Sequence, residues 1–448
     1  MKQSDVVIIG GSAGGVVVGV TARRHYPDLD VLLIRKEKEG QVMVPCGIPY
    51  IFGTVGSPDK NVMPDAILAS NGIKLMVDEV IDVDRAAKTV KTAGGEIIGY
   101  KKLVLATGSL PVQIPIPGVD MENVFTVWKD ADYLAKIQAA VEKAKDIVVI
   151  GGGFIGAEVA DECKKISGNN VTIVEMLPHC LMLALDAEFC CTTEEKLMER
   201  GIKIITDNGV KAILGNGKVE SVQLQSGNKL KADVVIMGIG ARPNTELPAK
   251  MGLKLGDMKG VWVDEYMRTS DEDIFACGDC ADKISFFTGK PSGLRLASIA
   301  TSEGRIVGAN LKELRRKNVG TIGVFATAFG DFAVASAGLT EKAAKDAGFD
   351  VAIGVASAPD RHPRCMPGAM EMKVKLMVDK KTGVVIGGEV CGGTATAEAA
   401  NIIAMALHSK TTAEQIALFQ AGTHPALTAS PVVYQLINAA EQALTKMR

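Results

Sequence analysis

Residues 146–160 read DIVVIGGGFIGAEVA, and this stretch decides the fold. A short run of β-branched and apolar residues leads directly into Gly151, Gly153 and Gly156, which have the spacing G-x-G-x-x-G. The first glycine of this pattern makes a tight turn, and the last allows a helix to pack closely on a strand. The N–H groups at the start of that helix are then available to a pyrophosphate. The stretch therefore predicts a βαβ dinucleotide-binding unit.

The next predicted strand, VTIVE at 171–175, ends in Glu175. A carboxylate at this point is placed to accept hydrogen bonds from both ribose hydroxyls, which favours NADH over NADPH. His179 lies close by and could soften that preference. Phe154 and Ile155 open the helix after the glycine turn and are predicted to line the same site.

A less regular copy of the pattern lies near the N-terminus. DVVIIG at 5–10 runs into GGSAGG, a helix-like segment reaches Arg24, and a second strand pattern follows at 31–34. Ser12 replaces the middle glycine, so a tight βα turn of an ordinary α/β protein is the alternative interpretation. Arg35 stands where an acidic partner of a ribose is expected, and it either contacts cofactor phosphates or lies on the surface. The predicted contacts of this site are Gly10, Gly11, Ser12, Ala13, Gly14, Gly15 and Arg35.

Three further segments, each a strand followed by a turn, lie between and after the two glycine fingerprints. LVLATGS at 103–109, VVIMGIGARPN at 234–244 and IFACGDCAD at 274–282 each read as a strand that ends in a glycine turn. With the two glycine fingerprints, they resemble the pyridine nucleotide–disulfide oxidoreductases over essentially the whole chain. The resemblance implies that the first fingerprint binds FAD and the second NADH, with NADPH possible. It also implies cofactor contacts from Thr107, Gly108, Gly240, Gly278 and Asp279.

The resemblance implies an α/β fold with two Rossmann-like domains and a C-terminal α+β dimerisation domain. The FAD domain is expected at 1–113 and 246–318, the NAD(P)H domain at 114–245, and the dimerisation domain at 319–448. Within the last, 382–392 reads as strand–turn–strand and 397–417 as helices. In this family, an aromatic at the position of Phe154 stacks over the flavin until NADH displaces it; a packed aromatic in a βα turn is the alternative.

The heptapeptide VPCGIPY at 44–50 carries the candidate redox centre, Cys46. Family members with a C-x-x-x-x-C pair would have a second cysteine at Ile51, so no such disulfide forms here. The sequence instead resembles the C-G-x-P-Y of the single-cysteine branch, which includes CoA-disulfide reductases, persulfide or polysulfide reductases, NADH peroxidases and NADH oxidases. A cysteine at a helix N-terminus favours the thiolate. The alternative is an inert core thiol.

The first glycine loop separates members of this branch. Peroxidases and oxidases have a histidine where this chain has Ala13, and GGSAGG resembles the GGVAGG of CoA-disulfide and persulfide reductases. A sulfur substrate is therefore expected. The family's CoA contacts match poorly: Arg24 is retained, with Arg23 beside it for phosphate binding, and Tyr50 completes the predicted substrate site.

Two C-terminal residues are candidate partners of the redox cysteine. His424-Pro425 resembles the His-Pro of the glutathione- and lipoamide-type enzymes, in which the partner subunit's histidine serves as acid and base. Cys365 stands where a substrate-contacting tyrosine would be and is a candidate resolving thiol across the dimer. The alternatives are a surface histidine and an unreactive cysteine. No metal site is predicted: Cys277 and Cys280 overlap the Asp279 motif, and the Cys190–Cys191 pair reads as helix filler.

Net charge, apolar runs and cysteine content indicate which partners and which compartment to expect. The net charge of −2 predicts neither a nucleic-acid nor a membrane partner, and no charge-free apolar run reaches eighteen residues. Nine scattered cysteines suit a reducing compartment, the cytoplasm. The sequence thus predicts a homodimeric, FAD-dependent NAD(P)H oxidoreductase that reduces a disulfide, persulfide, polysulfide or CoA disulfide through Cys46. Alternatives are an NADH oxidase that reduces O₂, a reductase for a small redox protein, and a nucleotide-sensing flavoprotein.

Overall fold

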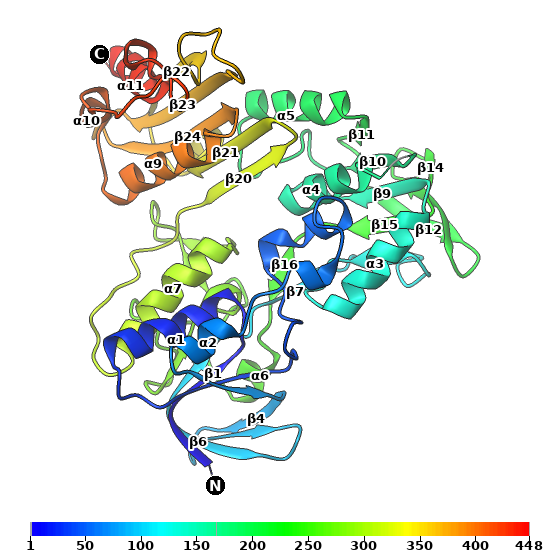
Figure 1. Cartoon of the computed structure of the whole chain (residues 1–448), viewed down its shortest axis with the longest axis vertical. Helices are drawn as coiled ribbons and strands as arrows, with labels where there is room; N and C mark the ends of the chain where they lie inside the picture. Colours follow the sequence, from blue (N-terminus) through cyan, green and yellow to red (C-terminus); the bar gives the residue numbers. More distant parts are fainter. Residues whose placement is uncertain (1, 167, 448) are drawn as a thin grey trace. The chain divides into compact units, whose positions relative to one another are not determined.

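The computed structural model describes residues 2–166 and 168–447, and its architecture is α/β (Figure 1). The chain forms two compact units, each made of two segments. Unit 1 comprises Met1–Ala144 and Ile239–Thr321, and unit 2 comprises Lys145–Gly238 and Ile322–Arg448. Among the described residues, no helix has both the length and the apolar character that crossing a membrane requires.

A mostly parallel sheet forms the centre of unit 1. Its strand order is β3-β2-β1-β6-β5-β4, and β17 pairs with β6. The strands are β1 (Lys2–Ile9), β2 (Val31–Arg35), β3 (Lys74–Val77), β4 (Val80–Asp84), β5 (Thr89–Thr92), β6 (Ile97–Leu105) and β17 (Ile274–Ala276). Residues 6–9 and 31–34 are buried without alternation, as expected for parallel strands that are covered on both faces.

Two long helices of unit 1 lie side by side (Figure 1). They are α1 (Ala13–His25) and α7 (Ala297–Asn310). A Cβ on Gly304 would lie 2.8 Å from the carbonyl oxygen of Gly14, and one on Gly308 would lie 2.7 Å from Cβ of Thr21. Glycine in α7 therefore allows the two helix backbones to approach closely.

The remaining elements of unit 1 are η1 (Pro45–Gly47), η2 (Pro49–Phe52), η3 (Pro58–Lys60), α2 (Ala66–Ser70), β7 (Ser109–Pro111), β8 (Val124–Thr126), α3 (Ala131–Lys143), β16 (Ala241–Pro243), α6 (Glu246–Lys250), η4 (Gly278–Cys280), β18 (Lys283–Ile284) and β19 (Pro291–Ser292).

Unit 2 begins with a second parallel βαβ arrangement. In the sheet, strands β11, β10, β9 and β15 are neighbours in that order. Along the chain, an antiparallel ribbon of β12, β13 and β14 lies between β11 and β15. The elements are β9 (Asp146–Ile150), α4 (Phe154–Lys164), β10 (Asn170–Val174), α5 (Ala187–Glu199), β11 (Ile202–Ile205), β12 (Val210–Gly215), β13 (Val219–Leu224), β14 (Lys229–Lys231) and β15 (Val234–Met237).

The C-terminal part of unit 2 is an antiparallel sheet with helices. The strand order is β20-β21-β24-β23-β22; α9 packs on β21 and β24, and α11 on β22 and β23. The elements are β20 (Val324–Phe329), β21 (Phe332–Gly338), α8 (Glu341–Asp346), β22 (Val351–Pro359), β23 (Glu371–Asp379), β24 (Val385–Gly392), α9 (Thr396–His408), α10 (Ala413–Ala417), η5 (Pro431–Val433) and α11 (Gln435–Thr445).

The predicted strand–turn–strand at 382–392 is wrong. The turn lies before the strand, where Thr382 donates to Asp379, and β24 then runs unbroken through Gly387 and Gly388. A Cβ on Gly387 would lie 2.0 Å from the carbonyl oxygen of Leu339. These glycines therefore serve close packing and not a turn. The helices expected at 397–417 are present as α9 and α10.

Candidate functional site: two glycine turns and an exposed cysteine

The first glycine turn lies between β1 and α1. Gly10 has φ +115°, and a Cβ on it would lie 2.2 Å from the carbonyl oxygen of Ala106. A Cβ on Gly15 would lie 2.0 Å from the carbonyl oxygen of Gly10. Ser12, the N-cap of α1, makes no side-chain hydrogen bond to the helix, so no capping side chain competes for its first N–H groups. The turn therefore has the cradle that a pyrophosphate requires.

The ends of β6 and β17 lie beside this turn. Thr107 donates through Oγ1 to the carbonyl oxygen of Asn244 at 2.7 Å, and the Asn244 N–H donates to the Gly108 carbonyl at 2.9 Å. The Cys277 N–H donates to the Leu105 carbonyl at the end of β6. The predicted residues Gly10–Gly15, Thr107, Gly108 and Gly278 thus meet at the carboxyl edge of one parallel sheet, where such folds bind ligands.

Asp279 is held as a carboxylate at this edge. Ser109 Oγ donates to its Oδ2 at 2.7 Å, and Lys129 Nζ lies 3.3 Å from the same oxygen. Burial alone would raise the pKa of Asp279, but Lys129, Ser109 and Lys283 outweigh it and hold the pKa below its ordinary value. Asp279 is therefore a fixed hydrogen-bond acceptor at neutral pH.

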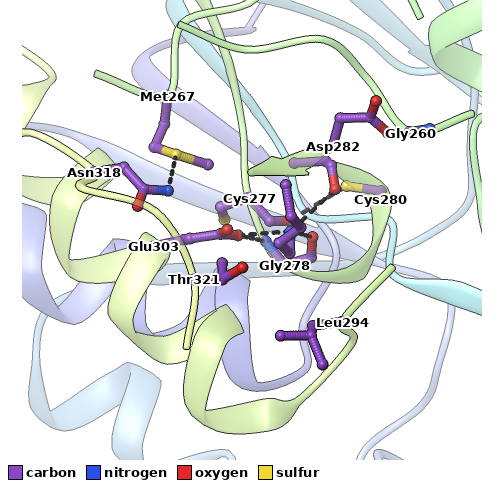
Figure 2. A network of polar contacts seen from close by, with 12 residues as sticks. Gly260, Met267, Cys277, Gly278, Cys280, Asp282, Leu294, Glu303, Asn318 and Thr321 are labelled. Carbon is purple, nitrogen blue, oxygen red and sulfur yellow. Dashed lines mark hydrogen bonds and ion pairs between the residues drawn. The ribbon is translucent and has the colours of Figure 1, made fainter. Parts of the chain in front are cut away.

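A buried ion pair between Glu303 and Lys283 supports the turn that carries Asp279. Figure 2 shows Glu303 beside Gly278 of that turn. Glu303 of α7 accepts from the Gly278 N–H at 2.7 Å through Oε2, and Lys283 Nζ lies 3.0 Å from the same oxygen. Lys283 also donates to the Gly278 carbonyl at 2.6 Å. Burial raises the pKa of Glu303, while Lys283 opposes that change. The sequence analysis missed this pair because nothing in the local pattern marks a lysine and a glutamate twenty residues apart as buried partners.

Arg35 is buried, so the surface interpretation of this residue is wrong. Its two terminal nitrogens donate to the two carboxylate oxygens of Asp65, each at 2.6 Å, and its Nε donates to the Glu37 carbonyl. A Cβ on Gly11 would lie 2.6 Å from Cδ of Arg35, so the side chain lies against the glycine turn. Asp65, which the sequence analysis did not identify, therefore orients the Arg35 guanidinium beside this turn.

Cys46 lies in the middle of η1, and its side chain is exposed. The helix expected to begin at Cys46 is not continuous: Pro49 lacks an N–H, and the chain forms two short 3₁₀ helices, η1 and η2. Asn61 fixes this loop, since its Nδ2 donates to the Val44 carbonyl at 3.0 Å and its carbonyl accepts from the Val44 N–H at 2.9 Å. The exposed thiol is thus carried by a positioned turn.

If Cys46 is the reacting group that the sequence predicts, Gly47→Ala should lower the rate of substrate reduction about 10-fold or more, because small displacements of a reacting group have effects of this size or larger. A Cβ at this position would lie 2.0 Å from Oδ1 of Asn61, so either the turn or Asn61 must move. Gly56→Ala is the control for backbone strain without a clash. At this position φ is +74°, but the nearest atom lies 3.9 Å from the added Cβ. Steady-state kcat/KM for both variants gives the comparison, and equal losses would contradict the prediction.

The three predicted substrate residues differ in environment. Arg23 is bound to backbone carbonyls, donating to Asn71 at 3.2 Å and to Leu29 at 2.7 Å, so it stabilises the end of α1. Arg24 is exposed. Tyr50 is half-buried, and its carbonyl accepts from the Val55 N–H within the Cys46 loop.

The second glycine turn, in unit 2, repeats the geometry of the first. Gly151 has φ +99°, and a Cβ on Gly156 would lie 1.9 Å from the Gly151 carbonyl oxygen. Gly153, the N-cap of α4, faces open space, and Ile155 is exposed. Gly240 belongs to unit 1, has φ +96° and accepts from the Val112 N–H. The second turn therefore also fits a nucleotide phosphate.

Glu175 lies at the end of β10, beside this turn. Its Oε2 accepts from the Gly152 N–H at 2.6 Å, and its Oε1 accepts from the Leu177 N–H at 2.8 Å. Each carboxylate oxygen retains a second lone pair, so Glu175 can still accept from a hydroxyl. A phosphate on that hydroxyl would meet a fixed negative charge.

We predict that Glu175→Gln raises the ratio of kcat/KM for NADPH to that for NADH about 10-fold. The change removes one negative charge while it keeps the size and one acceptor of the side chain. The exposed Glu195→Gln variant is the matched control for charge. Coenzyme titrations at fixed acceptor concentration measure both ratios, and an unchanged ratio in Glu175→Gln would refute this role.

Phe154 stacks on Phe325 of β20, with ring centroids 5.1 Å apart and ring planes within 6°. The structure thus gives Phe154 an aromatic partner within unit 2, as the alternative interpretation of this residue supposed. One turn further along α4, burial raises the pKa of Glu158 to about 7. The sequence analysis did not single out Glu158, although its position four residues after Phe154 places both on one face of the helix.

The folded-state pKa of Glu158 predicts a pH dependence of stability. The group is protonated more readily in the folded chain than in the unfolded one, so its contribution is favourable at low pH and is lost as the pH rises from about 4.5 to about 7. Glu158→Gln stays neutral throughout. We expect this variant to raise Tm over wild type by about 2–4 °C at pH 8 and by less at pH 5. Thermal melts of both proteins at pH 5 and pH 8 test this expectation. A Tm increase that is larger at pH 5 than at pH 8 would contradict the predicted direction of the pH dependence.

The loops of Cys365 and His424 lie together in unit 2. The His362 N–H donates to the Pro425 carbonyl at 3.0 Å, and its ring Nδ1 lies 3.0 Å from the Thr428 carbonyl. Cys365 and His424 are both exposed. A cavity of about 560 Å³ lies beside them, lined by Pro359, Arg361, His362, Pro363, Arg364, Ser430 and Val433. Its two arginines suit an anionic ligand.

The other cysteines divide by burial. Cys277, Cys280, Cys163, Cys190 and Cys391 are buried, as filler residues would be. Burial raises the pKa of Cys163 to about 12 and that of Cys391 to about 11, so both remain thiols. Cys191 is exposed, so its interpretation as helix filler is wrong.

Comparison with known families identifies the chain. The family described as pyridine nucleotide-disulphide oxidoreductase matches residues 4–304, and the dimerisation domain of the same family matches residues 324–433. The chain belongs to the pyridine nucleotide-disulphide oxidoreductase family. The predicted family, the α/β fold and the C-terminal dimerisation domain are confirmed.

NADH oxidases and persulfide or polysulfide reductases are among the relatives of this oxidoreductase. A Methanocaldococcus jannaschii NADH oxidase is 34% identical and covers 98% of this chain and 99% of its own. A Pyrococcus horikoshii NAD(P)H coenzyme A polysulfide/persulfide reductase is 34% identical over 87% of this chain and 88% of its own. The structure of an NAD-dependent persulfide reductase from A. fulgidus matches with a TM-score of 0.90 and 33% identity, over 98% of this chain and 83% of that one. Family membership makes the chain an enzyme that uses FAD and NAD(P)H, and its dimerisation domain indicates a homodimer.

Proposed function

We propose that this oxidoreductase transfers electrons from NADH to sulfur–sulfur bonds, and that Cys46 is the residue that attacks the substrate. The observation that carries the proposal is the exposed thiol of Cys46 on a turn fixed by Asn61, in the same unit as the first glycine turn. The persulfide and polysulfide reductases among the relatives support the substrate class. The odd count of nine cysteines supports a reducing compartment, the cytoplasm.

The residues of unit 1 fit FAD. Gly10 and Gly15 let the turn pack tightly, because a Cβ on either would meet a backbone carbonyl oxygen, and no capping side chain occupies the first N–H groups of α1, which suits a phosphate group. We assign the pyrophosphate to this turn and a hydroxyl-donating part of the cofactor to the Asp279 carboxylate. When bound, FAD supplies the two-electron relay between NADH and sulfur. In unit 2, Gly151–Gly156 and Glu175 would hold the phosphates and ribose of NADH.

The chemistry assigned to the chain is a thiolate exchange. The Cys46 thiolate attacks one sulfur of an R–S–S–R′ or persulfide substrate, a Cys46–S bond forms, the substrate S–S bond breaks, and the second sulfur leaves as a thiolate. Two electrons from NADH and one proton then cleave the mixed disulfide on Cys46. This releases the bound sulfur as a thiol or hydrogen sulfide and restores the thiolate.

We infer that the second copy in the homodimer supplies the proton and part of the substrate site. His424 is exposed, and an imidazole can pass a proton to a leaving thiolate. Arg361 and Arg364 line the adjoining cavity and would bind an anionic sulfur carrier such as CoA. We also assign the exposed Cys365, which lies on the loop of these arginines, the role of resolving thiol.

O₂ reduction is the second candidate function, because the M. jannaschii relative is an NADH oxidase. Ala13 opposes it: a small apolar side chain in the glycine loop offers no proton to a reduced oxygen species.

An acceptor comparison tests the proposal. The anaerobic FAD-loaded enzyme is mixed with NADH and either polysulfide, CoA persulfide, CoA disulfide or glutathione disulfide, and with O₂ in a separate aerobic reaction. We expect kcat/KM for polysulfide or a persulfide to exceed that for O₂ by at least about 10²-fold, equivalent to about 2.7 kcal/mol of differential transition-state binding. A higher value for CoA persulfide than for polysulfide would identify CoA as the carrier. A preference for O₂ would make the enzyme an NADH oxidase and overturn the proposal.

A further inference from the structure

Three metal-ligating side chains converge beside the second glycine turn, outside the residues assigned above. His179 lies in the loop after β10, while Cys191 and Glu194 lie three residues apart on α5 and share one face of it. Nδ1 of His179 lies 3.1 Å from Oε2 of Glu194 and 3.9 Å from Sγ of Cys191. One ligand atom of each residue lies within 4.8 Å of the other two.

These separations match the edges of a metal tetrahedron. With metal–nitrogen and metal–oxygen distances of about 2.1 Å and a metal–sulfur distance of about 2.3 Å, tetrahedral zinc places nitrogen and oxygen about 3.4 Å apart and nitrogen and sulfur about 3.6 Å apart. The observed 3.1 and 3.9 Å differ from these values by a few tenths of an ångström. A thiolate and a carboxylate would together neutralise a divalent cation, and the third ligand is a neutral imidazole.

The surroundings orient the ligands. Glu194 accepts from the Cys180 N–H at 2.7 Å through Oε1, so its other oxygen faces His179. Outer hydrogen bonds of this kind fix first-shell ligands in metal sites. The side chains of His179 and Glu194 are 27% and 12% exposed and Cys191 is exposed, so an ion can enter and a water can take the fourth position.

We propose that His179, Cys191 and Glu194 bind one zinc-class divalent cation. Such an ion would join the loop at 175–181 to α5. The same loop is tied to the glycine turn, because the Leu181 N–H donates to the Gly152 carbonyl at 2.9 Å and Glu175 accepts from the Gly152 N–H. The cation therefore stabilises the side of the turn at which Glu175 lies, whichever acceptor the enzyme reduces.

Cobalt titration of the chelator-treated, FAD-loaded enzyme tests this site. Co²⁺ bound by a thiolate gives a near-ultraviolet charge-transfer band, and we expect the band to saturate at one ion per chain. Cys191→Ser should abolish it. His179→Gln and Glu194→Gln should raise the dissociation constant at least about 10-fold. Zn²⁺ should displace the cobalt and remove the band.

Matched variants identify the thiol responsible. Cys46→Ser and Cys365→Ser each remove another exposed cysteine, and Glu195→Gln removes the neighbouring carboxylate of α5; all three should keep the band. Circular dichroism and FAD content verify that each variant is folded. A wild-type enzyme without the band, or a band that persists in Cys191→Ser, would overturn the proposal.

Discussion

Cys46→Ser should lower the rate of sulfur–sulfur bond reduction by at least about 10³-fold, while NADH still reduces the bound flavin. The hydroxyl of serine is nearly the size of the thiol, so the turn held by Asn61 and Gly47 is retained. Serine has no accessible anion at neutral pH and cannot form the mixed disulfide. Anaerobic stopped-flow separates the two half-reactions: flavin absorbance is followed first with NADH alone, and then after addition of polysulfide.

The control for this prediction is a second exposed thiol. Cys191→Ser also removes an exposed sulfur; with both proteins treated with chelator and assayed at saturating NADH, its rate should stay within about 2-fold of wild type. If Cys46→Ser reduces polysulfide at the wild-type rate, electrons leave the flavin by another route, as in a reductase that serves a small redox protein.

Gly15→Ala should abolish FAD retention and lower the stability of unit 1. The new Cβ would lie 2.0 Å from the Gly10 carbonyl oxygen, which is backbone and cannot rotate away, so α1 must move from β1. Overpacking of this kind costs about 1–3 kcal/mol or more. The displaced helix would also withdraw its N–H groups from the pyrophosphate. Flavin content after gel filtration and Tm of the purified variant measure the two effects.

Gly14→Ala is the matched control in the same loop. A Cβ there would lie 3.6 Å from Sγ of Cys277 and 3.7 Å from the Ala300 carbonyl, which are ordinary contacts. This variant should keep FAD, with Tm within about 2 °C of wild type. Equal loss of flavin in both variants would show that the clash with Gly10 is not the cause.

Features that depend on local backbone geometry were predictable from the sequence. Gly10, Gly15, Gly151 and Gly156 follow spacings that have a steric reason, and the structure shows that reason as a carbonyl within about 2 Å of a Cβ at Gly15 and Gly156. The apolar strands before each turn were predictable for the same reason, because a buried parallel strand needs an uninterrupted apolar run.

Features that depend on distant partners were not predictable. Asp65 binds Arg35 across thirty positions of sequence, and Lys283 meets Glu303 across twenty, so neither pair leaves a local pattern. A continuous helix does not form at Cys46 for a local reason: Pro49, two residues after Gly47, has no N–H for the hydrogen-bond ladder.

The three proposed metal ligands were only partly predictable from the sequence. Cys191 and Glu194 have a helical spacing that the sequence displays, but the third ligand comes from a loop whose path depends on tertiary contacts. His179 reaches α5 because Leu181 has φ +61° and its N–H donates to Gly152, and a leucine in that conformation has no sequence signal.

The mass of the Cys46 peptide tests the central claim most directly. Oxidised, FAD-loaded enzyme is exposed anaerobically to a persulfide without NADH, quenched at low pH, digested and analysed by mass spectrometry; a second sample receives NADH before the quench. The account predicts that the peptide gains one sulfur or the whole carrier thiol, and that NADH returns it to the free thiol mass. A peptide that keeps the free thiol mass in both samples, from enzyme that nevertheless turns the persulfide over, would contradict it.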